Sequence, residues 1–232
     1  MSQVYSTIIF EIDYQSKILE SNMKNKTRRE EIISAAKKLI IEKGYRKTSV
    51  EDITNETRMS KGNFYTYFRS KDSLICTLMS EKDDKFYKKL NEKIKYSKTL
   101  EEKIKNYVGH YLIIPVEDLD YMLVMITMIR SMDSIGKEIL ENIKQDKIRR
   151  KNEVIKILKE HRELIDISEE NDFEKYSLLI FRLINSFYIN NFHPLEKSGN
   201  ISIEEVKIKA SKMDFKYEIE FLTKIILKVI KK

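Results

Sequence analysis

Residues 48–74, which read TSVEDITNETRMSKGNFYTYFRSKDSL, decide the fold. Two short amphipathic segments lie in this stretch, residues 49–57 and residues 61–68. Each follows a residue type that caps helix N-termini, and Ser60 is placed to cap the second segment. Only three residues separate the two segments. We therefore predict two short helices joined by a tight turn, which is the arrangement of a helix-turn-helix.

The start of the first short helix has two candidate caps. Thr48 and Ser49 each have an acidic residue three positions later, Glu51 and Asp52 respectively, as in a capping box. The pattern leaves both caps open.

Apolar residues recur with helical spacing along most of the remaining chain, and glycine and proline are scarce, with five and two residues. The expected fold class is therefore all-α, with an N-terminal three-helix domain containing the helix-turn-helix and a C-terminal helical domain. The predicted helices cover residues 27–43, 49–57, 61–68, 71–96, 99 to a stop at Pro115, 119–132, 135–161, 172–192 and 214–231, with a short one at 203–213. The buried stripe of the helix over 71–96 is predicted at Leu74, Leu78, Phe86, Leu90 and Ile94.

The predicted domains are residues 1–26, 27–75 and 76–232. The first is an extension with a weak strand-like alternation at residues 8–13. It has two interpretations: either the native chain starts at Met23, or residues 1–22 form a loosely held arm.

Positive charge gathers on one short part of the chain. The net charge is +7, and residues 23–75 hold 13 Lys and Arg against seven Asp and Glu. A basic segment suggests a polyanionic partner, either nucleic acid or an anionic membrane, although a solvated lysine-rich surface explains the composition equally well.

The second short helix carries side chains suited to DNA. Phe64 and Phe68 are four residues apart and share one face, which we expect to be the core face. The opposite side then faces the major groove, where the second helix of a helix-turn-helix presents its N-terminal residues to the bases. Gly62 allows close approach of the backbone, and Asn63 and Lys61 can read adenine and guanine edges.

The stretch resembles the tetracycline-repressor (TetR) family. The family pattern is met, with all spacings kept, at Thr48, Ile53, Ser60, Lys61, Gly62, Tyr65, Tyr67, Phe68, Lys71 and Leu74. Thr54 and Thr57 stand where the family usually has alanine, and Arg58 where a turn glycine is common. A residue other than glycine at position 58 either accepts a positive φ or shifts the turn.

The resemblance, together with the hydrogen-bonding side chains, implies that the protein has a surface that binds operator DNA. Its expected residues are Thr48, Ser49, Ser60, Lys61, Gly62, Asn63, Tyr65, Thr66, Tyr67, Arg69 and Lys71. Lys71 would clamp a phosphate, and Thr48 or Ser49 would contact the DNA backbone. For Tyr65 and Tyr67 the alternative is ordinary packing between helices.

The resemblance further implies a C-terminal domain that senses a ligand and dimerises. The helices over 172–192 and 214–231 are apolar on more than one side, which favours a homodimer through a four-helix bundle; the alternative is a monomer with a thicker core. A small hydrophobic effector would bind in an apolar pocket that contains a few polar groups. The pocket candidates are Tyr107, Tyr111, Met122, Met125, Met128, Phe181, Asn185 and Tyr188, and for any single one of them the favoured alternative is plain core.

The function expected is a ligand-responsive transcriptional repressor that binds a palindromic operator as a dimer. The alternative is a protein of the same fold that organises DNA or recruits partners without an inducer. The chain shows no catalytic triad, metal cluster or phosphate-binding glycine loop, so we predict neither an enzyme nor a cofactor. With one cysteine, no secretory signal and no apolar run long enough to cross a bilayer, it is expected to be cytoplasmic and not bound to a membrane.

Overall fold

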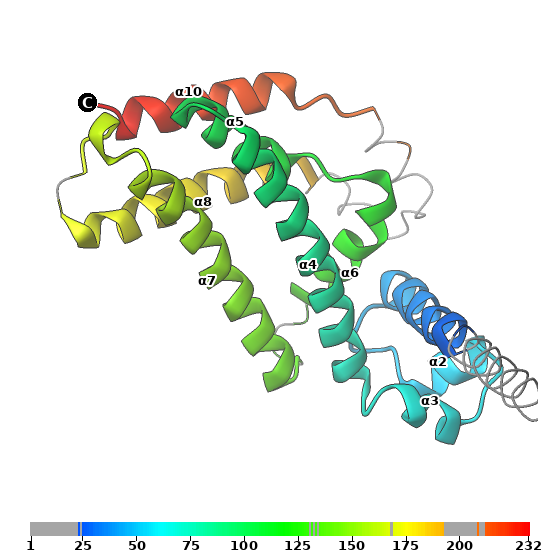
Figure 1. Ribbon diagram of the computed structural model, residues 1–232. Coiled ribbons are helices and arrows are strands. Elements are labelled where there is room, and N and C mark those ends of the chain that lie inside the picture. Colours follow the sequence, from blue (N-terminus) through cyan, green and yellow to red (C-terminus); the bar gives the residue numbers. More distant parts are fainter. Residues whose placement is uncertain are drawn as a thin grey trace, which may run out of the picture. The chain divides into compact units, whose positions relative to one another are not determined.

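The computed structural model of the protein describes residues 23, 25–129, 131, 133, 135–167, 169–192, 208 and 212–232. Regular structure in these residues is helical, apart from one isolated β-bridge between Ile165 and Lys231 (Figure 1). A helix over residues 25–43 is followed by α2 (Val50–Glu56), α3 (Lys61–Tyr67), α4 (Lys71–Tyr96), α5 (Leu100–Leu112), α6 (Leu119–Ile129), α7 (Lys137–Lys159), α8 (Glu170–Phe192) and α10 (Lys216–Ile230). Short 3₁₀ turns lie at Val116–Asp118 and Arg162–Leu164. The predicted alternation at residues 8–13 and nearly all of the predicted helix at 203–213 lie outside the described residues.

The chain divides into two compact units. The first contains the described residues up to Leu74 together with those between Val124 and Ser134, and the second contains those of Ile75–Leu123 and Ile135–Lys232. The helix-turn-helix therefore lies in the first unit, and most of the predicted C-terminal domain lies in the second.

Local signals in the sequence set the helix ends of the first unit. Gly44 has a φ of +88°, and its amide donates to the carbonyl of Ile40 at 2.9 Å, which ends the helix over 25–43. Ser49, and not Thr48, caps α2, in a complete capping box with Asp52. The core of this unit is formed by Ile32, Ala36, Ile40, Ile53, Phe64, Phe68 and Leu74.

The second unit is a layered helical assembly. Thr99 caps α5 in another complete capping box, with Glu102. α5 packs against α10 and α8, and α7 packs against α8 (Figure 1). The one cysteine of the chain, Cys76, lies on α4 with 8% of its surface exposed.

The stripe predicted for α4 needs one correction. Leu74, Leu78, Leu90 and Ile94 are buried as expected. At the remaining position Tyr87 is fully buried and Phe86 only partly so. Tyr87 can be buried because its hydroxyl donates to Oδ1 of Asp146 at 2.9 Å. The polar group of this side chain therefore has a hydrogen-bond partner inside the unit.

Several predicted helix ends lie a few residues away from the observed ones. α6 ends at Ile129 and not at residue 132, and α7 covers Lys137–Lys159 and not 135–161. Helix ends are set partly by contacts that periodicity does not report. No described helix is both long enough and apolar enough to span a bilayer.

Candidate nucleic-acid interface

α3 turns its phenylalanines inward and leaves its other side to solvent. Phe64 is fully buried, and Phe68, which follows the helix, is 4% exposed; their ring centroids are 5.9 Å apart. Ser60 accepts a hydrogen bond from the amide of Asn63 and so caps the helix. The exposed residues are Ser60, Lys61, Gly62, Asn63, Tyr65, Thr66 and Arg69, which together form what we term the outer face of α3.

The two tyrosines of α3 have different surroundings. Tyr65 is 54% exposed, and its ring meets the Phe64 ring edge-on. Tyr67 is half-buried, and its hydroxyl donates to Oδ1 of Asn25 at 3.3 Å. Tyr65 is therefore available to a ligand, whereas Tyr67 also packs within its own unit, as the alternative for it predicted.

The turn between α2 and α3 answers the question raised by Arg58. This residue adopts a φ of +52°, so the turn keeps the backbone conformation that a glycine would favour. The amide of Met59 donates to the carbonyl of Thr54 at 2.9 Å and closes the turn. Thr54 is buried, and the Thr57 hydroxyl donates to the Ile53 carbonyl at 2.8 Å. The three departures from the TetR pattern are thus accommodated without loss of the turn.

The N-terminus of α2 presents one of the two residues predicted there. Ser49 is exposed, whereas Thr48 is 1% exposed and its hydroxyl donates to the Gly44 carbonyl. The expected DNA contact of the Thr48 side chain is therefore wrong for this conformation, because the side chain lies in the core. Lys43 and Ser49 both bond to Asp52, and these donors hold the pKa of its carboxyl well below the usual value.

Lys71 does not point outward with Lys61. Its ammonium donates to the carbonyls of Tyr45 and Thr48, each at 2.7 Å, and lies 3.9 Å from the centroid of the Tyr45 ring. Burial lowers the pKa of this ammonium. The structure therefore separates Lys71 from the other predicted DNA contacts.

Exposed cations occur in the helix-turn-helix and in the residues just before it. Lys61 pairs with Glu51 at 3.1 Å, and both side chains are more than half exposed, so the pair is weak and can exchange for a phosphate. Arg46, Lys47 and Arg58 are also exposed, and none of them is among the predicted DNA contacts. Their only signal in the sequence was their place in the basic segment.

The described pocket candidates are divided between the two units. Tyr107, Tyr111, Met122 and Phe181 are buried or partly buried in the second unit, whereas Met125 and Met128 fall in the first. Asn185 is exposed. The side chain of Tyr188 lies outside the described residues.

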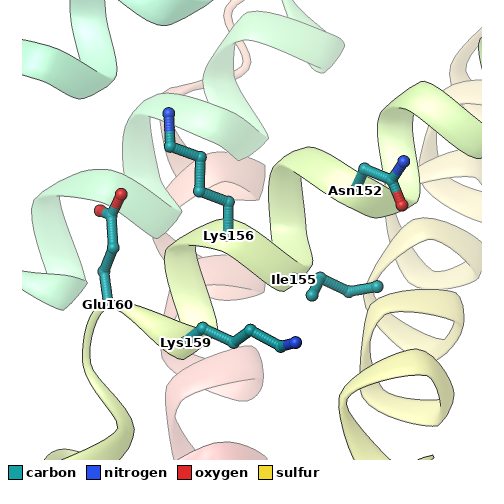
Figure 2. A pocket seen from close by; sticks show the side chains of 5 residues that line it. All are labelled: Asn152, Ile155, Lys156, Lys159 and Glu160. Carbon is teal, nitrogen blue, oxygen red and sulfur yellow. The ribbon is translucent and has the colours of Figure 1, made fainter.

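Surface hollows in the second unit involve other residues. One, of about 470 Å³, is lined by Asn152, Ile155, Lys156, Lys159 and Glu160. All five come from α7 or the residue after it, and Figure 2 shows their polar ends pointing in different directions. Their polar groups do not converge on a common point, as they would in a built ligand site. A second, of about 430 Å³, lies along α5 and α10.

A polar cluster of Tyr87, Tyr107, Tyr111, Asp146 and Arg150 joins α4, α5 and α7. The carboxylate of Asp146 accepts from the Tyr87 hydroxyl at 2.9 Å and from Nε of Arg150 at 2.6 Å. The Tyr107 hydroxyl donates to the Arg150 carbonyl, and the guanidinium lies 4.8 Å from the Tyr111 ring centroid. The Tyr111 hydroxyl is buried and has no hydrogen-bond partner among the described residues. The spacing of Asp146 and Arg150, four residues apart on a helix, was the signal for this pair.

Comparison with known proteins agrees with this geometry. The family model described as "Bacterial regulatory proteins, tetR family" matches residues 32–76. An uncharacterized HTH-type transcriptional regulator, YuxN, of Bacillus subtilis is 46% identical over 65 residues, which are 28% of this chain and 22% of that protein. The fatty acid metabolism regulator protein of the same organism is 34% identical over 74 residues, or 32% and 38% of the two chains. The chain thus matches well under half the length of these two relatives.

The fold similarity extends further along the chain. The solved structure of the fatty acid degradation regulator FadR from Bacillus halodurans has a TM-score of 0.63 over 86% of this chain and 94% of its own, with 20% identity. At this identity the likeness establishes the fold. The helix-turn-helix segment, residues 32–76, matches the TetR family of bacterial regulatory proteins.

Proposed function

We propose that the protein is a ligand-responsive transcriptional repressor that binds operator DNA as a homodimer in the cytoplasm. The observation that carries this proposal is the outer face of α3, an exposed polar and basic surface held rigid by Phe64 and Phe68 beneath it. A short helix of this kind, preceded by a capped helix and a tight turn, suits the major groove.

Within the proposed interface, different side chains serve different roles. Asn63, in the first turn of α3, faces the base edges, where asparagine reads adenine, and Lys61 beside it pairs with a phosphate. The Tyr65 and Thr66 side chains, together with Ser49 at the start of α2, are placed for phosphate oxygens. Arg69 adds a flanking positive charge.

The proposed dimer forms through α8 and α10. Ile219, Leu222, Ile226 and Ile230 bury one side of α10 within the second unit. A second apolar stripe on the same helix, at Tyr217, Phe221, Ile225 and Val229, is exposed or half-buried. A helix with two apolar sides needs two partners, and within the described part of the chain this second side stays exposed or half-buried.

α8 extends this second stripe. Leu179 is 42% exposed, and Leu183 and Phe187 follow it at intervals of four residues, both half-buried. The rings of Phe187 and Phe221 lie 6.1 Å apart, so the stripes of α8 and α10 form one surface, which we term the α8–α10 face. Pairing of two such faces about a two-fold axis would bury both in a four-helix bundle.

The proposed effector is a small hydrophobic molecule bound by the second unit. Tyr107, Tyr111 and Met122, which are buried there, and half-buried Phe181 supply apolar surface that can rearrange around a ligand. One relative is named as a regulator of fatty acid metabolism, so acyl chains are the first compounds to test.

Chromatin immunoprecipitation with sequencing would locate the operator, and fluorescence anisotropy with that DNA would measure affinity. The double variant Lys61→Ala with Tyr65→Ala should bind at least tenfold more weakly. The slope of log affinity against log salt concentration should fall by about 0.9, since one phosphate contact of Lys61 is lost. Many scattered genomic sites, in place of one or a few promoters, would favour a DNA-organising role.

The matched control is Lys95→Ala with Tyr96→Ala at the end of α4. The same residue types are removed there from exposed positions in the second unit, and Tyr96 is 78% exposed. This control should bind as the parent protein does. Equal affinity of the Lys61/Tyr65 variant and the parent would remove the outer face of α3 from the DNA interface.

A further inference from the structure

The hydroxyl of Tyr111 lies in the polar cluster of α4, α5 and α7 and has no hydrogen-bond partner among the described residues. The whole residue is 8% exposed, so solvent does not readily supply that partner. The other two tyrosines of the cluster differ in this respect. The Tyr87 hydroxyl donates to Asp146, and the Tyr107 hydroxyl donates to the Arg150 carbonyl. A buried donor without an acceptor costs free energy, so the Tyr111 hydroxyl calls for a specific reason.

The guanidinium of Arg150 also has donors to spare. Its Nε donates to Oδ2 of Asp146 at 2.6 Å. An arginine side chain has five N–H donors, and the four on Nη1 and Nη2 make no hydrogen bond within the described part of the chain. The side chain is 30% exposed, so a ligand can still reach this edge of the guanidinium.

Aromatic rings surround these donors. The Arg150 guanidinium lies 4.8 Å from the Tyr111 ring centroid and 5.9 Å from that of Phe86, and the two rings are 4.8 Å apart. Burial raises the pKa of the Tyr111 hydroxyl, and the Arg150 charge opposes this rise. The cation therefore acts on the hydroxyl in surroundings where a charge-assisted hydrogen bond is strong.

A carboxylate fits this set of donors. Its two coplanar oxygens match the planar edge of a guanidinium, and an oxygen bonded to Arg150 can also accept from a hydroxyl. Asp146 is itself a carboxylate on the same guanidinium. A phosphate group with two negative charges would lie close to the Asp146 charge and is disfavoured by repulsion.

We propose that Arg150 and Tyr111 bind the carboxylate of the effector, and that the effector is a monocarboxylic acid whose hydrocarbon part packs on the surrounding aromatic rings. The role of this acid as an effector rests on the proposed function. The site itself is defined by the unused donors of Arg150 and Tyr111, both in the second unit.

Isothermal titration calorimetry of the full chain with hexanoate, decanoate and tetradecanoate tests the site. At least one of these acids should bind, and the amide of the same chain length should bind about tenfold more weakly, because it has no charge for Arg150. In Arg150→Lys the affinity for the acid should fall about tenfold, since an ammonium lacks the planar fork, while the affinity for the amide stays the same. No binding by any of the three acids, or equal affinities for acid and amide, would overturn the proposal.

Tyr111→Phe provides a second readout. Its Tm without ligand should equal or exceed that of the parent, because the lost hydroxyl has no partner, while the affinity for the acid should fall about tenfold. Tyr107→Phe should lower the Tm, because it removes a hydroxyl bonded to the Arg150 carbonyl. Tyr96→Phe, at an exposed position, is the control and should change neither quantity. A Tm of Tyr111→Phe as low as that of Tyr107→Phe would overturn the assignment, because the hydroxyl would then have a partner in the free protein.

Operator release separates this site from the proposed function. An acid that binds through Arg150 and Tyr111 but leaves operator affinity unchanged would overturn its role as effector and leave the carboxylate site in place. A protein that releases its operator for an uncharged compound, and binds none of the three acids, would overturn the site and leave the ligand-responsive repressor in place.

Discussion

At the scale of the residue, Arg58 carries a conformational cost. Its φ of +52° lies in the left-handed region, where an L-residue with a side chain is disfavoured. The side chain is exposed, so little packing holds it there. The turn between α2 and α3 is therefore less stable than the same turn with glycine would be.

Arg58→Gly should stabilise the protein by about 0.5–1 kcal/mol, since the left-handed strain of about 1–2 kcal/mol is relieved and the greater freedom of glycine in the unfolded chain offsets part of the gain. Thermal unfolding followed by circular dichroism would measure the change. Arg58→Ala is the matched control, because alanine retains the Cβ atom and should give no gain. Equal midpoints for the two variants would show that the positive φ is not costly.

At the scale of the element, α4 and α7 place acidic groups close together. Asp83 on α4 is half-buried and faces Asp146 on α7, with Arg150, Arg149 and Asp84 also nearby. Burial, followed by the Asp146 charge, raises the pKa of Asp83 from 3.8 to about 7. The folded protein therefore keeps this proton over a pH range in which the unfolded chain has lost it.

The sign of the resulting pH dependence follows from linkage. Between pH 4 and pH 7 the folded state binds more protons at Asp83 than the unfolded state, so stability falls as the pH rises through this range and levels off above it. Asp83→Asn should therefore be more stable than the parent at pH 8 by about 1–2 kcal/mol, after allowance for solvent at the half-buried group, and the difference should shrink at pH 5. Urea unfolding at both pH values would measure it.

Asp84→Asn serves as the comparison for Asp83→Asn. Asp84 is the neighbouring aspartate, and its side chain is 75% exposed. This variant should show no comparable gain at pH 8. A gain of the same size in both variants would indicate a general charge effect in place of the buried proton.

The helices and the outer face of α3 could be predicted because their signals are local. The caps at Ser49, Ser60 and Thr99 depend on residues three positions apart, and the inward side of α3 follows from the four-residue spacing of Phe64 and Phe68.

Features that depend on other elements were not predictable in the same way. Lys71 was expected on a phosphate but lies on the carbonyls of a turn more than twenty residues earlier. Tyr87 is buried in place of Phe86 because Asp146 on α7 satisfies its hydroxyl. Periodicity does not contain such contacts, because they are made after the helices pack.

At the scale of the whole molecule, the α8–α10 face predicts an obligatory partner. Leu179 and Phe221 lie on this face and are 42% and 41% exposed. A double variant, Leu179→Glu with Phe221→Glu, should place like charges on both halves of the proposed interface. We expect the mass from light scattering to change from twice the chain mass of 27.7 kDa to that of a single chain, with operator affinity falling at least tenfold.

Tyr96→Glu is the control for the dimer, because Tyr96 is an exposed aromatic residue that belongs to α4 and not to the proposed face. Its mass should remain that of a dimer. A double variant with unchanged mass would refute association through α8 and α10, whatever its DNA affinity.

The burial of Cys76 within α4 makes the protein convenient for spectroscopy. Thiol reagents attack accessible thiolates, so a maleimide or methanethiosulfonate spin label should leave this position largely unmodified in the native state. A second cysteine introduced at exposed Thr66 would then be the preferred target without removal of the first. In the proposed dimer, pulsed electron resonance between two such labels would report the distance between the two α3 helices, with and without the proposed effector.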